Sequence, residues 1–171
     1  GDVLKGIQKD YDSDEYRLEL LYHKFFSFQK EQMSETEKLS MLIKAAVKST
    51  PQPQESPKWE YIAARLLMLR FQLQLQAELD KQQITGFYEK ICYLTNQNLY
   101  GSYILQAYTK AEIDEFETWI VEERNHLFTY SSLDVLLKRY VIHTHQLLLM
   151  PAASWQIPYQ NRPAGRGGSC L

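Results

Sequence analysis

The segment that most constrains the fold is a helical pattern that begins at Ser56 and Pro57 and is apolar round more than half of its circumference. A serine at the N-cap and a proline at the first helical position are typical of a helix start. Its apolar positions are Trp59, Ile62, Ala63, Leu66, Leu67, Leu69 and Leu73. A helix with so wide an apolar surface must pack on several sides, so the sequence predicts a central helix surrounded by others.

Other segments carry the signals of further helices. A capping box, in which a serine or threonine is followed three residues later by a glutamate, occurs at Ser34 and Glu37 and again at Thr109 and Glu112. Apolar residues at helical spacing predict helices over 14–31, 35–49 and 81–96, one that opens at Thr109, and one from about Ser131 to Arg139. We therefore expect a mainly α fold with a few short strands at most, the first of them near Tyr140–Ile142.

The ends of the chain are expected to be less regular. Residues 1–12 are polar and predicted to be loose, and the proline-rich stretch Ser49–Pro57 is predicted to be a loop. Residues 146–171 contain no acidic residue, three prolines and a glycine-rich run, which is typical of a disordered tail.

Composition excludes several function classes. The net charge of the 171 residues is -2, so no strong field attracts nucleic acid or an anionic membrane. No run of 18 apolar residues predicts a transmembrane helix, and the first residues lack an apolar signal core. Cys92 and Cys170 form no spacing motif. These features predict a cytoplasmic protein without a disulfide framework.

No constellation in the chain predicts an autonomous active site. Glycine-rich nucleotide-binding loops are absent from the sequence. His143 and His145 have the spacing of two metal ligands on one face of a strand, but no third ligand is near, so we predict a solvated strand end and no metal site. The acidic residues of 112–123 sit at a helix start and on an expected solvent face, where solubility and dipole complementation explain them.

Arg65 is the one charged residue that stands out within the apolar helix. Buried arginine requires a paired acid or a cage of carbonyl groups. We interpret Arg65 as a structural ion pair that fixes helix packing, in preference to a ligand contact. The candidate partners are the acidic helix after Thr109 and the pair Glu122 and Glu123.

Several motifs together resemble one protein family. Met33–Val47, with its Ile-Lys-Ala-Ala core, and Pro57–Leu67, with its Tyr-Ile-Ala-Ala-Arg-Leu run, resemble successive helices of the large (alpha) subunit of class I ribonucleotide reductase. The similarity continues in order through Phe87–Glu89, Asn98–Gly101, Leu105–Glu112, Glu123–Ser131 and Leu137–Tyr140. It covers roughly residues 16–145.

The resemblance implies a role in reducing ribonucleotides to deoxyribonucleotides. In the family, an ATP-cone that senses ATP and dATP and a helical domain precede a ten-stranded α/β barrel, which carries the catalytic cysteines. It further implies a partial or degenerate ATP-cone over 1–50, the helical N-terminal domain over 51–145, and a non-matching tail over 146–171. The family's nucleotide-contacting hydroxyl falls on Ser34.

Departures from the family pattern limit what this chain is expected to do. Gly1–Gly6 does not reproduce the strand motif that opens the cone, and Leu73 stands near the position of a basic residue, so ATP or dATP is expected to bind weakly or not at all. Neither cysteine lies in a stretch that resembles a catalytic segment. The leading hypothesis is a part of the reductase large subunit without catalytic residues or cofactor, which acts with the barrel and the small subunit. The alternative is a non-catalytic helical protein-interaction module.

Overall fold

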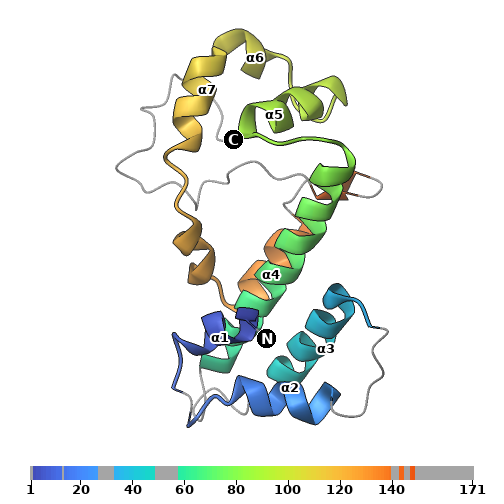
Figure 1. Ribbon diagram of the computed structural model, residues 1–171. Helices are drawn as coiled ribbons and strands as arrows, with labels where there is room; N and C mark the ends of the chain where they lie inside the picture. Colours follow the sequence, from blue (N-terminus) through green and yellow to red (C-terminus); the bar gives the residue numbers. More distant parts are fainter. Residues whose placement is uncertain are drawn as a thin grey trace. The chain divides into compact units, whose positions relative to one another are not determined.

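The computed structural model confirms the predicted mainly α fold (Figure 1). It describes residues 2–12, 14–26, 33–48, 58–139, 143–144 and 147–148. The helices are α1 (Asp2–Gln8), α2 (Leu18–Phe26), α3 (Glu35–Lys48), α4 (Lys58–Lys81), α5 (Phe87–Asn96), α6 (Tyr103–Ala107), α7 (Lys110–Glu117), the 3-10 helix η1 (Glu122–Leu127) and α8 (Tyr130–Arg139). Two short antiparallel strands, β1 (His143–Thr144) and β2 (Leu147–Leu148), pair His143 with Leu148 and Thr144 with Leu147.

The chain forms two compact units. The first comprises Gly1–Gln74 and Phe128–Arg139, and the second comprises Leu75–Leu127 and Tyr140–Leu171. The module boundaries that the family resemblance implies, near residues 50 and 145, are a separate division of the chain and stay a prediction. The predicted loop Ser49–Pro57 and the predicted strand Tyr140–Ile142 lie outside the described residues, as does the tail apart from Leu147–Leu148.

The core of the first unit is built on α4, which confirms the prediction of a central helix. Its side chains are buried at Trp59, Ile62, Ala63, Ala64, Leu66, Leu67, Met68 and Phe71. Helix α3 contributes Leu39, Leu42, Ile43, Ala45 and Ala46, and α8 contributes Leu133 and Leu137. Burying a large aliphatic side chain contributes about 1.5–3 kcal/mol, so this shared surface is the main source of the unit's stability. Towards its end α4 becomes less apolar, and Leu73 is 40% exposed.

The expectation that residues 1–12 are loose is wrong. Asp2–Gln8 forms α1, because Leu4 and Ile7 stand on one side of the helix and are buried. The turn that follows is held by the side chain of Gln8. Its amide oxygen accepts a hydrogen bond from the Leu18 backbone N–H (3.0 Å), and its amide nitrogen donates to the Tyr11 carbonyl (3.2 Å).

The second unit shows why the predicted helix over 81–96 begins late. Gln83 has a φ of 58°, in the left-handed region, so α4 ends just before it and α5 starts only at Phe87. The Ile84 N–H donates to the Leu79 carbonyl (2.9 Å) and the Gln83 N–H donates to the Asp80 carbonyl (3.1 Å). These two bonds form a Schellman motif, in which a left-handed residue closes the last turn of a helix.

Helix α5 ends in the same way. Asn98 has a φ of 57°, the Leu99 N–H donates to the Leu94 carbonyl (2.9 Å), and the Asn98 N–H donates to the Thr95 carbonyl (3.0 Å). The hydrophobic contact that often accompanies the motif is present at the end of α4, where Leu79, Ile84 and Leu94 form one buried cluster. Local backbone hydrogen bonds therefore end both α4 and α5.

Helices α6 and α7 pack on α5. Phe87, Ile91, Ile104 and Ile113 form a second buried cluster, and the rings of Phe87 and Phe116 stack at 6.2 Å between centroids. The predicted capping box at Thr109 and Glu112 is confirmed, with both reciprocal hydrogen bonds present. The helices α6 and η1 were not predicted, because each is only five or six residues long and carries no complete apolar periodicity.

Candidate functional site

Ser34, the residue predicted to contact nucleotide, lies in a network of hydrogen bonds at the start of α3. The Glu37 carboxylate accepts from the Ser34 backbone N–H (2.8 Å) and from the Ser34 hydroxyl (3.0 Å), while the Glu37 N–H donates to that hydroxyl (3.2 Å). The predicted capping box is thus present. The hydrogen bonds from the Ser34 backbone and then from its hydroxyl lower the pKa of Glu37, so its carboxylate is held in the charged form.

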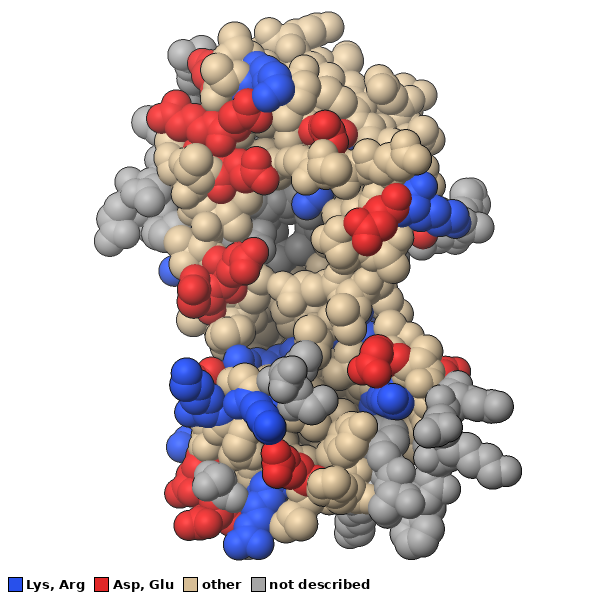
Figure 2. All heavy atoms as spheres, in the orientation of Figure 1, with Lys and Arg blue, Asp and Glu red and all other residues tan. Residues whose placement is uncertain are grey.

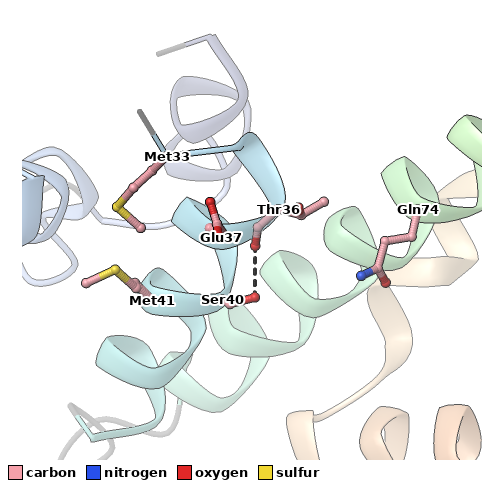
Figure 3. Close-up of a pocket in the computed structure, with 6 residues that line it drawn as sticks. All are labelled: Met33, Thr36, Glu37, Ser40, Met41 and Gln74. Atoms are coloured by element: carbon pink, nitrogen blue, oxygen red, sulfur yellow. Dashed lines mark hydrogen bonds between the residues drawn. The ribbon is translucent and has the colours of Figure 1, made fainter. Parts of the chain in front are cut away.

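A shallow depression lies beside this helix start (Figure 3). Its volume is about 360 Å³, and it is lined by Met33, Thr36, Glu37, Ser40, Met41 and Gln74. The Ser40 hydroxyl donates to the Thr36 carbonyl (2.8 Å) and accepts from the Arg70 guanidinium (3.0 Å), so it connects α3 with α4. Gln74 reaches the depression from α4.

This arrangement does not suit a nucleotide phosphate. The Ser34 hydroxyl is already bonded to Glu37 and lies 3.1 Å from the Thr36 hydroxyl. An ionised carboxylate at the same helix start disfavours the approach of a second anion. The exposed side chain next to Gln74 is the apolar Leu73. The role of Ser34 in nucleotide binding stays a prediction.

Arg65 forms an ion pair with Asp10, from the turn after α1. The Arg65 side chain is 13% exposed and the Asp10 side chain 55% exposed. Burial raises the pKa of the adjacent Tyr11, and the Arg65 charge and hydrogen bond oppose that shift. The partner therefore differs from the candidates in 109–123, because sequence reasoning did not expect an ordered helix and turn before residue 13.

Near Arg65, a row of aromatic rings connects the same turn to α4. The rings of Tyr11 and Tyr16 lie 6.1 Å apart, and those of Tyr16 and Trp59 lie 5.4 Å apart, both edge to face. Tyr16 is 1% exposed. These contacts together explain Arg65 as a group that positions the N-terminal turn on α4.

Nucleophilic and basic side chains of the second unit occur on α5. Cys92 is a half-buried free thiol. Its hydrogen bond with the side chain of Tyr88 is the main reason that the pKa of Tyr88 is raised. The Lys110 ammonium lies 5.3 Å from the centre of the Tyr88 ring. Lys90 is half-buried, and burial lowers its pKa while Glu117 opposes the shift. The packing of α5 on α7 accounts for the contacts with Lys110 and Glu117, whereas Tyr88 and Cys92 lie one turn apart on α5.

The acidic residues of 112–123 are mostly exposed, as predicted, and acidic side chains gather over α7 and η1 in Figure 2. Within the described ranges, no group of three or more His, Cys, Asp or Glu side chains could hold a metal ion. His143 lies on β1, and His145 is outside the described residues. None of the described helices combines the length and apolar character that a bilayer crossing requires.

Sequence reasoning missed most of the residues that line the depression. It identified Glu37 as a capping residue but did not single out Met33, Ser40 or Met41. A signal was present, since Met33, Glu37 and Met41 recur every four residues, which places them along one side of a helix. Gln74 could not be found in this way, because its contribution depends on how α4 packs against α3.

Comparison with known proteins identifies similar chains. The chain matches no protein-family model. It is 53% identical over 142 residues to the ribonucleoside-diphosphate reductase subunit alpha of Treponema pallidum (strain Nichols), covering 83% of this chain and 17% of that protein. It is 30% identical over 140 residues to the subunit alpha of Enterobacteria phage T4, covering 82% of this chain and 18% of the phage protein. A third relative, ribonucleoside-diphosphate reductase 1 subunit alpha of Escherichia coli (strain K12), is 23% identical over 88 residues, covering 52% of this chain and 11% of that protein.

Proposed function

This chain is a homologue of part of the ribonucleoside-diphosphate reductase alpha subunit, and from that premise we propose that it supplies a helical N-terminal part of such a reductase. The proposed overall reaction is the reduction of ribonucleotides to deoxyribonucleotides for DNA synthesis. The observation that carries the proposal is the 53% identity to the Treponema protein across 83% of this chain. Identity at that level over so many residues requires common descent.

The proposed contribution of this chain is structural and not chemical. The chain spans 17–18% of the two most extensively matched alpha subunits, and its described thiol, Cys92, lies on α5 against Tyr88. We expect the isolated chain to produce no deoxyribonucleotide. Its proposed partners are the catalytic barrel and the reductase small subunit, and its proposed compartment is the cytoplasm.

The proposed modules follow the family pattern. Residues 1–50 correspond to a partial or degenerate ATP-cone, 51–145 to the helical domain, and 146–171 to a tail without a family counterpart. ATP or dATP is expected to bind weakly or not at all. The engaged Ser34 hydroxyl, the ionised Glu37 carboxylate and the apolar Leu73 support that expectation.

A binding experiment tests the proposal. The purified chain is immobilised and exposed separately to a barrel-containing alpha segment and to a small subunit from the same source. Retention of the barrel-containing segment, with circular dichroism showing an intact helical chain, is the expected result. Retention of neither protein by the folded chain would contradict the structural role.

Two solution measurements accompany it. Turnover is assayed with a ribonucleoside diphosphate and a dithiol donor, and a deoxyribonucleotide product from the chain alone would refute the proposed division of labour. Calorimetry with ATP and dATP measures the effector site. A micromolar dissociation constant, abolished by Ser34→Ala, would show that an intact nucleotide site is present.

A further inference from the structure

Two methionine side chains lie along one side of α3, at the margin of the depression. Met33 precedes the helix and Met41 lies within it, with Glu37 midway between them, and all three line the depression. Figure 3 shows the two thioether side chains projecting from the same side of α3. Both methionines are half-buried residues that line a depression open to solvent.

These methionines do not belong to the core of the first unit. The buried positions of α3 are Leu39, Leu42, Ile43, Ala45 and Ala46. Met68, on α4, is only 5% exposed and is a core residue. The described part of the chain therefore contains two partly exposed methionines and, in the same unit, a buried one for comparison.

We propose that Met33 and Met41 form a reversible oxidation site for hydrogen peroxide. A sulfur lone pair attacks one peroxide oxygen, and an S–O bond forms as the O–O bond breaks. The leaving hydroxide removes the proton from the transferred hydroxyl group, which gives water and the sulfoxide. The sulfur loses two electrons to the peroxide, and the product is methionine sulfoxide, which sulfoxide reductases convert back. This inference is independent of the proposed reductase role.

The modification changes the character of the depression without disrupting the core. A thioether is an apolar, weak hydrogen-bond acceptor, whereas a sulfoxide is polar. Two such groups would turn the apolar part of the lining polar, in a depression that already contains the Gln74 amide and the Glu37 carboxylate. Because neither methionine is among the buried residues of α3, the helix itself is expected to persist.

Peptide mapping tests the site. The full chain is treated with dilute hydrogen peroxide, sampled over time and digested, and the gain of one oxygen atom is quantified at Met33, Met41 and Met68. Met33 and Met41 are expected to react at least about tenfold faster than Met68, because oxidation of a buried side chain requires a local opening of the structure. A methionine sulfoxide reductase is expected to restore both.

A matched variant separates accessibility from unfolding. Leucine has nearly the volume of methionine and does not form a sulfoxide, so the double variant Met33→Leu and Met41→Leu is expected to fold and to keep Met68 slow. Circular dichroism of the oxidised parent chain is expected to match that of the reduced chain. Equal oxidation rates at all three methionines, or loss of helical signal in step with oxidation of Met33 and Met41, would overturn the proposal.

Discussion

Replacing Gln83 with glycine is expected to stabilise the second unit. Gln83 is exposed and has a φ of 58°, so its side chain contributes little burial while its backbone is in the left-handed region. That conformation costs a residue with a Cβ atom about 1–2 kcal/mol. Glycine avoids this cost, but it loses more conformational entropy on folding than glutamine does, which destabilises the fold by about 0.5–1 kcal/mol. When the low ends of the two ranges are compared with each other, and likewise the high ends, the difference is a net stabilisation of about 0.5–1 kcal/mol.

The assay is amide hydrogen exchange at the end of α4, together with urea unfolding. The Ile84 N–H closes the motif on the Leu79 carbonyl, so its exchange reports the local opening. At 1.4 kcal/mol for each factor of ten, the expected stabilisation slows exchange about two- to fivefold in Gln83→Gly. The urea midpoint is expected to rise in the same variant.

Gln97 provides the matched control. It is also an exposed glutamine at a helix end, at the C-cap of α5, but its φ is -83°. Gln97→Gly therefore gains no relief and is expected to lose about 0.5–1 kcal/mol through entropy alone. If Gln83→Gly destabilises the chain as much as Gln97→Gly, the backbone of Gln83 is not strained and the reasoning is refuted.

Three further outcomes are expected. Burial raises the pKa of Tyr100 to about 12 from an ordinary 10.0, so between these pH values tyrosine ionises in the unfolded chain first and the free energy of unfolding falls as pH rises. After allowance for solvent screening, Tyr100→Phe should make that fall smaller by about 1 kcal/mol, as measured by urea unfolding across this pH range. Burial lowers the pKa of Lys90, so its charged form destabilises the fold below pH 10.5, and Lys90→Met should raise the melting temperature at neutral pH; a lower value would show that attraction to Glu117 dominates. Asp10→Asn should lower the free energy of unfolding by about 0.5–1 kcal/mol in the parent chain and should have no effect when Arg65 is already replaced by Met. The same loss in both backgrounds would show that the ion pair contributes nothing to stability.

The sequence predicted those parts of the fold whose signals are local. The capping boxes at Ser34 and Thr109 and the apolar periodicity of the central helix are properties of consecutive residues, and the structure confirms them. The start of α5 was placed six residues early, because a single left-handed glutamine ends α4 and glutamine carries no turn signal of its own. In contrast, Asn98 belongs to a residue type that tolerates this conformation, and the predicted end of the helix at residue 96 is confirmed.

The candidate site was less predictable, because it depends on contacts between distant segments. Asp10 and Arg65 are separated by 55 positions, and Ser40 and Arg70 by 30. Neither pair can be inferred from spacing within one helix. Family resemblance drew attention to Ser34, and the charge within an apolar helix drew attention to Arg65. Neither signal supplied Asp10 or the two methionines beside Glu37.

The side chain of Gln8 has a consequence for which residues can replace it. It accepts a hydrogen bond from Leu18 and donates one to the Tyr11 carbonyl, so it must present an acceptor and a donor on one planar end group. Glutamate keeps the reach but, when ionised, has no donor, and asparagine keeps the chemistry but is one methylene shorter. Spontaneous deamidation of this one residue would therefore place a carboxylate against the Tyr11 carbonyl and remove a hydrogen bond that holds the turn. The turn that carries Asp10 would then lose order as the fraction of deamidated protein increases with time.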